Sequence, residues 1–408
     1  MKNKLIITRL WDGIATALYL DGRAAELSFD RETETPLPGN IYIGKVKNVV
    51  KNIQAAFVEI EDGISCYLPL SEKAEPYFTN KTNSPRLVAG DELLVQIARE
   101  GVKTKAPTVT ANISFPGKYL VLTSGKTQTG ISAKLAKAER ERLQQIAGRL
   151  PEGNFGWILR TNAAEAEEEE ILREAETLAK RFEDICRTAR YRTCKSCLYR
   201  SPAAWLAHLK DIRQTECEEI LTDDQGLYDR LQAYLAENLP ADAEKLSFYE
   251  DRLLPLYKLY SLEGAFEEAL RERVWLKSGA YLVIQPTEAL TAIDVNTGKC
   301  ERGKKASETF RKINLEAARE AARQIRLRNL SGIILIDFIN MDSKEEEQRL
   351  LAALDAELQK DPVKAYAVDI TPLGLAEVTR KRVQKPLAEK MRQSVPQGRN
   401  PHCAQEPR

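Results

Sequence analysis

The chain lacks the features of a membrane protein, of a secreted protein and of a strongly charged binding protein. No apolar run reaches the roughly 18 residues that a membrane helix needs, and the N-terminal run Leu5-Ile6-Ile7 is too short for a secretory signal. The seven cysteines are an odd number scattered through 408 residues, which predicts reduced thiols and a cytoplasmic location. Lysine and arginine total 61 against 60 acidic residues, so the net charge of +1 indicates no class of partner.

Local patterns predict a β-rich first part. The length of 408 residues predicts two to four structural units. Residues 1–34 alternate apolar and polar side chains around Asp12-Gly13, which predicts a β-hairpin that must pack on a later part of the chain. Short β-rich segments with turn signals between residues 38 and 116 predict a small barrel of the oligonucleotide-binding kind.

The remainder of the chain is predicted to contain both strands and helices, followed by an α/β layer. Further strands are expected at 118–123 and 156–161, and helices at 134–149, 162–185, 202–213 and 227–238. From residue 269 the order becomes strand, basic loop, helix at 314–328, strand, helix at 343–359, strand at 365–370 and a basic helical tail. This alternation predicts an α/β layer.

Two apolar strands of this layer each end on a carboxylate, Asp294 and Asp337, and Asn296 follows two residues after the first, on the same face of the strand. An Asp at the end of a buried strand has a large desolvation cost, which a hard cation such as Mg²⁺ commonly offsets. We therefore expect a Mg²⁺ site for phosphodiester hydrolysis, with the phosphodiester held by basic-loop residues Lys299, Arg302, Lys304 and Lys305. The alternative from spacing alone is that the two Asp residues cap helices or turns.

Several segments closely resemble the ribonuclease E/G family, in matching order over nearly the whole chain. They are Thr287-Glu-Ala-Leu-Thr-Ala-Ile-Asp-Val-Asn-Thr-Gly298, Asn314 to Ala318, Gln324 to Gly332, Ile333 to Met341 and, in the expected barrel, Asn40 to Lys45, Ala55 to Val58 and Tyr67 to Leu70. The resemblance implies a Mg²⁺-dependent endoribonuclease that cuts single-stranded RNA in rRNA processing and mRNA decay, often with a preference for a 5′-monophosphate end. It also implies that Asp294 and Asp337 are the metal-binding catalytic carboxylates and that Asn296 orients the site.

The resemblance further implies an α+β multidomain fold. An oligonucleotide-binding β-barrel (36–116) would be inserted in a discontinuous RNase H-like subdomain (1–35 plus 206–268). A small 5′-sensor subdomain (117–205), a C-terminal α/β deoxyribonuclease-I-like catalytic layer (269–392) and a tail (393–408) would follow. The chain resembles the short, ribonuclease G-like form of the family.

Two further groups of residues are candidates for RNA contacts. Phe57 and Tyr67, flanked by Arg99 and Lys105, would stack bases on the barrel; from the pattern alone, both rings could instead be core. Arg160 and Thr161 end a strand and suit either a phosphate or a salt bridge to the Glu-rich stretch 165–170. The resemblance implies base stacking at the first group and a 5′-monophosphate pocket at the second, completed by Gly117, Val121 and Lys364.

The cysteines give little support for zinc. The family's Cys-Pro-x-Cys pair, through which two protomers share a zinc ion, is missing from the tail, which carries His402 and Cys403. Cys194 and Cys197 form a CxxC without a second pair at the usual distance, so we expect uncoordinated thiols there. A homodimer or higher homo-oligomer is expected without that link. Two alternatives to the endoribonuclease stay open: an RNA-binding remnant of the family, and a phosphatase or exonuclease using the same carboxylates.

Overall fold

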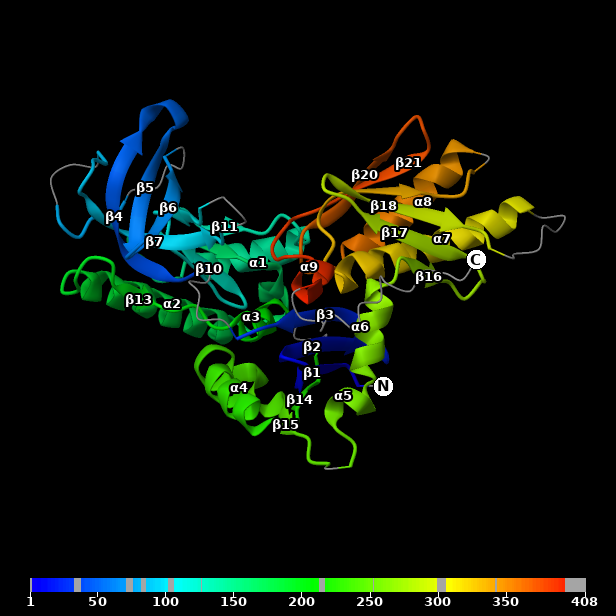
Figure 1. The fold of residues 1–408 in the computed structure, drawn as a ribbon, viewed down its shortest axis with the longest axis horizontal. Coiled ribbons are helices and arrows are strands. Elements are labelled where there is room, and N and C mark those ends of the chain that lie inside the picture. Colours follow the sequence, from blue (N-terminus) through cyan, green and yellow to red (C-terminus); the bar gives the residue numbers. More distant parts are fainter. Residues whose placement is uncertain are drawn as a thin grey trace. The chain divides into compact units, whose positions relative to one another are not determined.

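The computed structural model describes residues 2–32, 38–70, 76–81, 86–101, 106–125, 127–212, 217–251, 253–298, 306–341 and 343–392. The chain forms two compact units, the first from residues 1–32, 211–236 and 240–408 and the second from residues 33–210 and 237–239 (Figure 1). Within the described ranges, no helix combines the length and the apolar content that crossing a membrane requires.

The first unit begins with a mixed sheet in the order β15-β14-β1-β2-β3. Its strands are β1 (Lys4–Leu10), β2 (Gly13–Leu20), β3 (Arg23–Asp30), β14 (Glu219–Thr222) and β15 (Leu246–Phe248). The β1–β2 and β2–β3 pairs are antiparallel, whereas β14 runs parallel to both β1 and β15. The predicted hairpin and its later packing partner are therefore confirmed, and the partner is β14.

Three helices cover one face of this sheet. They are α5 (Leu256–Leu259), α6 (Leu262–Leu270) and α9 (Leu387–Arg392). Phe266 and Leu387 are buried with Ile6 and Phe29 of the sheet in one apolar core. The helix α4 (Gln225–Asn238) and the 3₁₀ segment Pro240–Lys245 lie between β14 and β15 in the chain.

The second sheet of the first unit has the order β16-β17-β18-β19-β21-β20. Its strands are β16 (Arg273–Trp275), β17 (Tyr281–Pro286), β18 (Leu290–Asn296), β19 (Gly332–Asp337), β20 (Ala365–Ile370) and β21 (Leu375–Arg380). The pair β18–β19 is parallel, as the crossover through helix α7 (Ala306–Leu327) requires, and the other neighbours are antiparallel. Residues of α7 and α8 (Lys344–Leu358) bury one face of the sheet, while alternate side chains on the opposite face stay accessible.

Two predictions for this sheet were wrong in detail. The helix expected at 314–328 begins at Ala306, and the region expected to be a basic helical tail starts with the end of strand β21. Strand β21 was missed although its residues alternate between partly and fully buried positions. Only Leu387–Arg392 of the basic region forms a helix, α9.

Arg380, the last residue of β21, forms a buried ion pair with Asp361. Its Nε donates to Asp361 Oδ2 at 2.7 Å, and both side chains are 4% exposed. The guanidinium also donates to the side-chain oxygen of Asn329 at 2.6 Å and to the backbone carbonyl of Leu330 at 3.1 Å. The pair therefore ties the end of β21 to the segments that follow α8 and α7.

The second unit contains a closed β-barrel. Its strands run in the order β4-β5-β6-β8-β7, and a further β4–β7 pairing closes the ring. They are β4 (Ile41–Val50), β5 (Ala55–Glu61), β6 (Ile64–Pro69), β7 (Glu92–Arg99) and β8 (Thr108–Thr110), with β13 (Cys197–Tyr199) added beside β4. The predicted barrel is confirmed, and its closure leaves few open strand edges.

A smaller sheet and two helices complete the second unit. The sheet has the order β11-β12-β10-β9, from β9 (Ser114–Pro116), β10 (Leu120–Thr123), β11 (Gly130–Ile131) and β12 (Gly156–Leu159). Helices α1 (Lys137–Ala147) and α2 (Glu168–Ala189) share a core with this sheet and with barrel residues such as Ile41. Acidic residues form the first turn of α2, where their negative charges interact favourably with the positive end of the helix dipole. The Glu-rich stretch is therefore the start of a helix. The remaining segments are α3 (Ala204–Ala207) and the 3₁₀ turns Lys51–Ile53, Thr161–Glu165 and His208–Asp211.

Candidate active site

The carboxylates Asp294 and Asp337 lie side by side on the accessible face of the second sheet. They are direct partners in the parallel register of β18 and β19, so their Cα atoms are about 5 Å apart. Their strand neighbours Ile293 and Ile336 point the other way, into the helix-covered core. The alternation of the two strands thus brings two acidic side chains from distant parts of the sequence to one place.

Both carboxylates are exposed, so the desolvation argument made from the sequence was wrong. The side chains do not end in a buried crevice, because the strand alternation turns them toward the uncovered face of the sheet. The capping alternative also finds no support in the described residues, where neither carboxylate accepts a bond from a helix-terminal or turn N–H. Asp294 and Asp337 are therefore available to a ligand.

Asn296 orients one of the two carboxylates. Its Nδ2 donates to Asp294 Oδ2 at 2.7 Å. That bond leaves the other oxygen of Asp294 and both oxygens of Asp337 without a protein partner among the described residues. The spacing-based expectation that Asn296 shares a face with Asp294 is met.

The donor set fits one hard cation. Mg²⁺ prefers oxygen ligands and is commonly held by one or two carboxylates together with water and phosphate oxygens. Across the described residues, no group of three or more His, Cys, Asp or Glu side chains is arranged to hold a metal. A site on Asp294 and Asp337 would thus leave most coordination positions to water and substrate. The basic-loop residues expected to assist them, Lys299, Arg302, Lys304 and Lys305, lie outside the described residues.

Asn314 of α7 holds the segment that follows β19, a role that the sequence analysis missed. The side chain is fully buried; its Nδ2 donates to the Ile339 carbonyl at 2.7 Å, and its Oδ1 accepts the Ile339 N–H at 3.1 Å. An amide that pairs with both backbone groups of one residue fixes the chain two residues beyond Asp337. The sequence signal for this role was a polar residue, Asn314, on the apolar face of the predicted helix.

Asn314→Ala should destabilise the first unit by about 1–3 kcal/mol, because it leaves the N–H and C=O of the partly buried Ile339 without their partners. Urea unfolding followed by circular dichroism would measure the change. Asn340→Ala, the same substitution at an exposed position of the same segment, is the control and should change little. Equal stabilities of the two variants would contradict the role given to Asn314.

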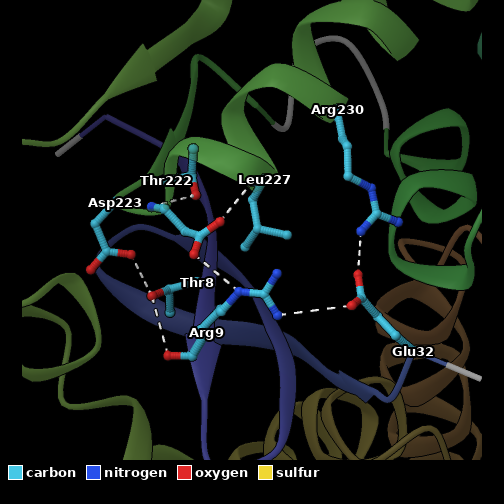
Figure 2. A network of polar contacts seen from close by, with 8 residues as sticks. Thr8, Arg9, Glu32, Thr222, Asp223, Leu227 and Arg230 are labelled. Atoms are coloured by element: carbon cyan, nitrogen blue, oxygen red, sulfur yellow. Dashed lines mark hydrogen bonds and ion pairs between the residues drawn. The ribbon is translucent and has the colours of Figure 1, made fainter.

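A second group of carboxylates, at the end of β14, is hydrogen-bonded to neighbouring parts of the protein (Figure 2). Thr8 Oγ1 donates to Asp223 Oδ1 at 2.5 Å, and Arg9 Nε donates to Asp224 Oδ2 at 3.0 Å. The other oxygen of Asp224 accepts a backbone N–H from the first turn of α4. The other oxygen of Asp223 accepts the backbone N–H at the start of α5. All four oxygens have protein partners, so this group stabilises the fold, and it is not part of any cluster of three or more metal-ligating side chains in the described ranges.

The barrel brings three of its predicted RNA-binding residues into one row. Phe57 pairs with Tyr67 across β5 and β6, Tyr67 pairs with Thr108, and Thr108 pairs with Arg99. The two rings pack edge to face with centroids 6.2 Å apart, and both stay partly exposed while their strand neighbours are buried. The interpretation that both rings are core is therefore wrong. Lys105 lies outside the described residues.

Glu59, on the same strand as Phe57, forms ion pairs with Lys195 at 2.7 Å and with Lys47 at 2.8 Å. Hydrogen bonds from Lys195 and then Lys47 lower the pKa of Glu59 to about 2. Because this value lies below the pKa of about 4.3 expected in the unfolded chain, the ion pairs stabilise the fold above pH 4.3. That contribution is lost as the pH falls toward 2.

We expect Glu59→Gln to lower the melting temperature at pH 6, and the difference from the unmodified protein to shrink steadily below about pH 4.3. Thermal unfolding at pH 6, 4 and 3 would measure it. Glu61→Gln, on the same strand, is the matched control. A difference that does not change between pH 6 and pH 3 would argue against ionised Glu59 as its cause.

The turn between β9 and β10 brings together two of the predicted 5′-phosphate residues. Arg160 donates from its guanidinium to the Gly117 carbonyl at 2.6 Å. Glu174 of α2 accepts the backbone N–H groups of residues 118–120 at 2.6–2.8 Å. Burial raises the pKa of Glu174, whereas these amide bonds and Arg160 lower it. A Cβ on Gly117 would lie 2.4 Å from the Glu174 carboxyl carbon, so the turn requires glycine there.

The other predicted sensor residues are less closely connected. Val121 is partly buried on β10, opposite Pro116, and Thr161 begins the 3₁₀ turn after β12. Lys364 belongs to the first unit, immediately before β20, where its Nζ lies 5.5 Å from the ring centroid of Tyr366. The structure thus connects Gly117 and Arg160 directly, whereas Lys364 belongs to the other compact unit.

The described cysteines have free thiols: Cys66, Cys186, Cys194, Cys197 and Cys217. Burial raises the pKa of Cys66, Cys186 and Cys217 to about 11, and it also raises the pKa of Cys194. Thiols with raised pKa values are poor nucleophiles and poor metal ligands at neutral pH. His402 and Cys403 of the tail lie outside the described residues.

Comparison with known proteins gives a consistent result. The ribonuclease E/G family profile matches residues 114–383. The chain is 33% identical over 379 residues to ribonuclease G of Salmonella typhimurium, covering 90% of this chain and 77% of that protein. It is 34% identical over 383 residues to ribonuclease G of Haemophilus influenzae, covering 91% and 78%. It is also 34% identical over 355 residues to ribonuclease E of a Nostoc species, covering 84% of this chain and 51% of that protein.

Proposed function

Because the chain belongs to the ribonuclease E/G family, we propose that it is a Mg²⁺-dependent endoribonuclease that cuts single-stranded RNA in RNA processing and decay. The observation that carries the proposal is the pairing of Asp294 with Asp337 at one register of β18 and β19, on an accessible face. A phosphodiester can reach these carboxylates from solvent.

The two carboxylates and Asn296 have different tasks in this mechanism. Asp294 and Asp337 would hold the ion, and Asn296 keeps the Asp294 carboxylate in one orientation through its 2.7 Å hydrogen bond. An Mg²⁺ ion held by these residues would supply a Lewis acid for the phosphoryl group and would lower the pKa of a bound water. Asn314 contributes indirectly, because it fixes the chain just beyond Asp337. The chain thereby orients the reacting groups before the substrate arrives.

The barrel would hold the RNA. The row Phe57, Tyr67, Thr108 and Arg99 presents two partly exposed rings and a cation along one line of the surface. Aromatic rings beside a cation suit single-stranded RNA, since bases stack on the rings and the cation attracts the phosphates. Lys105, outside the described residues, would add a second positive charge.

Phe57→Ala should weaken binding of a short single-stranded RNA by about 1–3 kcal/mol, the stacking energy of one base. Fluorescence anisotropy with EDTA present would measure affinity without cleavage. Phe57→Tyr keeps the ring and serves as the control, which should bind like the unmodified protein. Reduced turnover at unchanged affinity would count against the barrel as the RNA-binding surface.

A preference for 5′-monophosphate ends is the finer part of the proposal. Arg160 already donates to Gly117, so a terminal phosphate would meet an ordered guanidinium and, through Thr161, a hydroxyl donor. Val121, on β10 of the same unit, would complete the proposed pocket. Lys364, which the family resemblance adds to this group, belongs to the first unit and cannot bind a phosphate through two parallel hydrogen bonds, as an arginine can.

The subdomain layout, the assembly and the location are also proposals. The order β15-β14-β1-β2-β3 supports an RNase H-like subdomain, and the helix-backed second sheet supports a deoxyribonuclease-I-like one. We propose a cytoplasmic homo-oligomer without a zinc link, since the family's Cys-Pro-x-Cys pair is missing, Cys194 and Cys197 form a CxxC without a second pair at the usual distance, and burial raises the pKa of Cys194.

The test is incubation of the purified protein with a 5′-monophosphorylated, AU-rich single-stranded RNA, with Mg²⁺ or with EDTA. Internal fragments that require Mg²⁺ would support the endoribonuclease. Mononucleotide products would indicate an exonuclease, and loss of the terminal phosphate alone would indicate a phosphatase. RNA binding without any cleavage would identify an RNA-binding remnant of the family. The same RNA with a 5′-hydroxyl tests the end preference.

A further inference from the structure

An aromatic and cationic cluster, Arg273, Trp275 and Tyr281, lies on the same accessible face as the carboxylates. Trp275 is 63% exposed. Its ring centroid is 5.1 Å from that of Tyr281, with the ring planes at 56°, and the Arg273 guanidinium lies 4.7 Å from the Tyr281 ring centroid. An exposed tryptophan packed beside a second ring and a cation forms a surface that a bound partner would cover.

Strand register places the cluster directly beside the carboxylates. Trp275 pairs with Tyr281 across β16 and β17, and Tyr281 pairs with Asn296 across β17 and β18. In the neighbouring row Arg273 pairs with Val283, which pairs with Asp294. Trp275 is therefore two strand spacings, about 10 Å, from Asn296.

The hairpin that carries the cluster is held in place. The Glu316 carboxylate of α7 accepts the backbone N–H groups of Lys277 at 2.8 Å and of Ser278 at 3.3 Å, in the turn between β16 and β17. Gly298 follows β18 at φ +60°, and a Cβ there would lie 2.2 Å from the carbonyl oxygen of Gly279 in that turn. Because these contacts hold the turn between β16 and β17, the strands that carry the two rings are fixed before a ligand binds. Binding therefore costs little conformational freedom.

We propose that Trp275 and Tyr281 stack a base of the RNA whose phosphodiester lies at Asp294 and Asp337. The inference rests on the proposed function and adds a second stacking site to the barrel row. The cluster has the composition of a nucleic-acid surface, two rings beside a cation, and it is continuous with the carboxylates through the strand register. Stacking is tolerant of base identity, so this site would position the strand without setting a sequence preference.

Photocrosslinking tests the location without relying on cleavage. A single-stranded RNA with 5-iodouridine at one position at a time is irradiated with the full-length protein in EDTA, and the crosslinked peptides are identified. The expected crosslink lies in residues 273–281 and disappears in Trp275→Ala. Crosslinks confined to the barrel or to the peptide with Trp11, which is 38% exposed, would overturn the proposal.

Kinetics with abasic substrates test the stacking itself. Removing the base at the stacked position should lower kcat/KM of the unmodified protein by about 5- to 150-fold, the effect of losing one stacked base. Trp275→Ala should lose a similar factor on intact RNA but should be nearly insensitive to that abasic position, because the partner is already gone. Trp275→Phe should recover most of the loss. If the loss caused by Trp275→Ala and the loss caused by base removal multiplied at every abasic position, the proposal would be overturned.

The outcomes separate this inference from the proposed function. Absence of cleavage by the unmodified protein would refute the nuclease, whereas a crosslink at residues 273–281 would still support the stacking site. Normal cleavage that depends on Asp337 but is unaffected by Trp275→Ala would refute the stacking site alone. A change of oligomer size in Trp275→Ala without any crosslink would assign the cluster to contacts between copies and also refute it.

Discussion

Asp337→Asn should lower the rate of RNA cleavage by at least about 100-fold, the loss typical of removing one electrostatic group that stabilises a transition state. Its carboxylate is exposed, faces Asp294 across one strand spacing and has no protein partner in the described part of the chain. Asn keeps the shape of the side chain but removes the charge that a hard cation needs. Asp294→Asn should have an effect of the same size, since both carboxylates would bind one ion.

Single-turnover cleavage at saturating Mg²⁺ would measure this loss, and anisotropy would show that RNA affinity is largely kept. Asp369→Asn is the matched control, because Asp369 is an exposed carboxylate on β20 of the same sheet. Asn296→Ala should lose less than either Asp variant, since it removes an orienting bond and no charge. Unchanged cleavage by Asp337→Asn, or loss of RNA binding in its place, would refute the assignment of the pair.

Asp361→Asn should destabilise the first unit by about 3–5 kcal/mol, the usual cost of breaking a buried ion pair from one side. Its partner Arg380 is 4% exposed and would remain in the core without a counter-charge. The remaining bonds of Arg380, to Asn329 and Leu330, are to neutral oxygens and cannot replace the carboxylate.

Urea unfolding of the full-length protein would report this as a lower midpoint for the first unit. A double variant, Asp361→Leu with Arg380→Met, separates two causes. It should recover most of the stability if the uncompensated charge is responsible, because apolar pairs often replace buried ion pairs at little cost. A double variant as unstable as Asp361→Asn would show that the hydrogen-bond network itself, and not the charge, is required.

Local features of the sequence were sufficient for several elements. The alternation around Asp12-Gly13 predicted a hairpin, and the short β-rich segments predicted the barrel strands, because turn chemistry and side-chain alternation act over a few residues. The family resemblance identified the residues that the structure finds on one row, such as Phe57 and Tyr67. Neither source could show that Asp294 and Asp337 would be exposed.

Charge runs were the least reliable guide. The basic stretch 380–392 was interpreted as a helical tail, yet Arg380 is buried and ends a strand that sequence analysis missed. A run of like charges does not show which of its side chains are buried. Arg380 can be buried because another part of the chain supplies a carboxylate, Asp361, as its partner.

The sequence by itself determined which carboxylates end the apolar strands, that Asn296 shares a face with Asp294, and that a barrel precedes the layer. Only the tertiary structure decided which strands are neighbours and at what register. It aligned Asp294 with Asp337, placed Tyr281 opposite Asn296 and placed Thr108 between Tyr67 and Arg99. The physical reason is that register depends on backbone pairing between segments far apart in the chain, where the alternation of one strand carries no information about its partner.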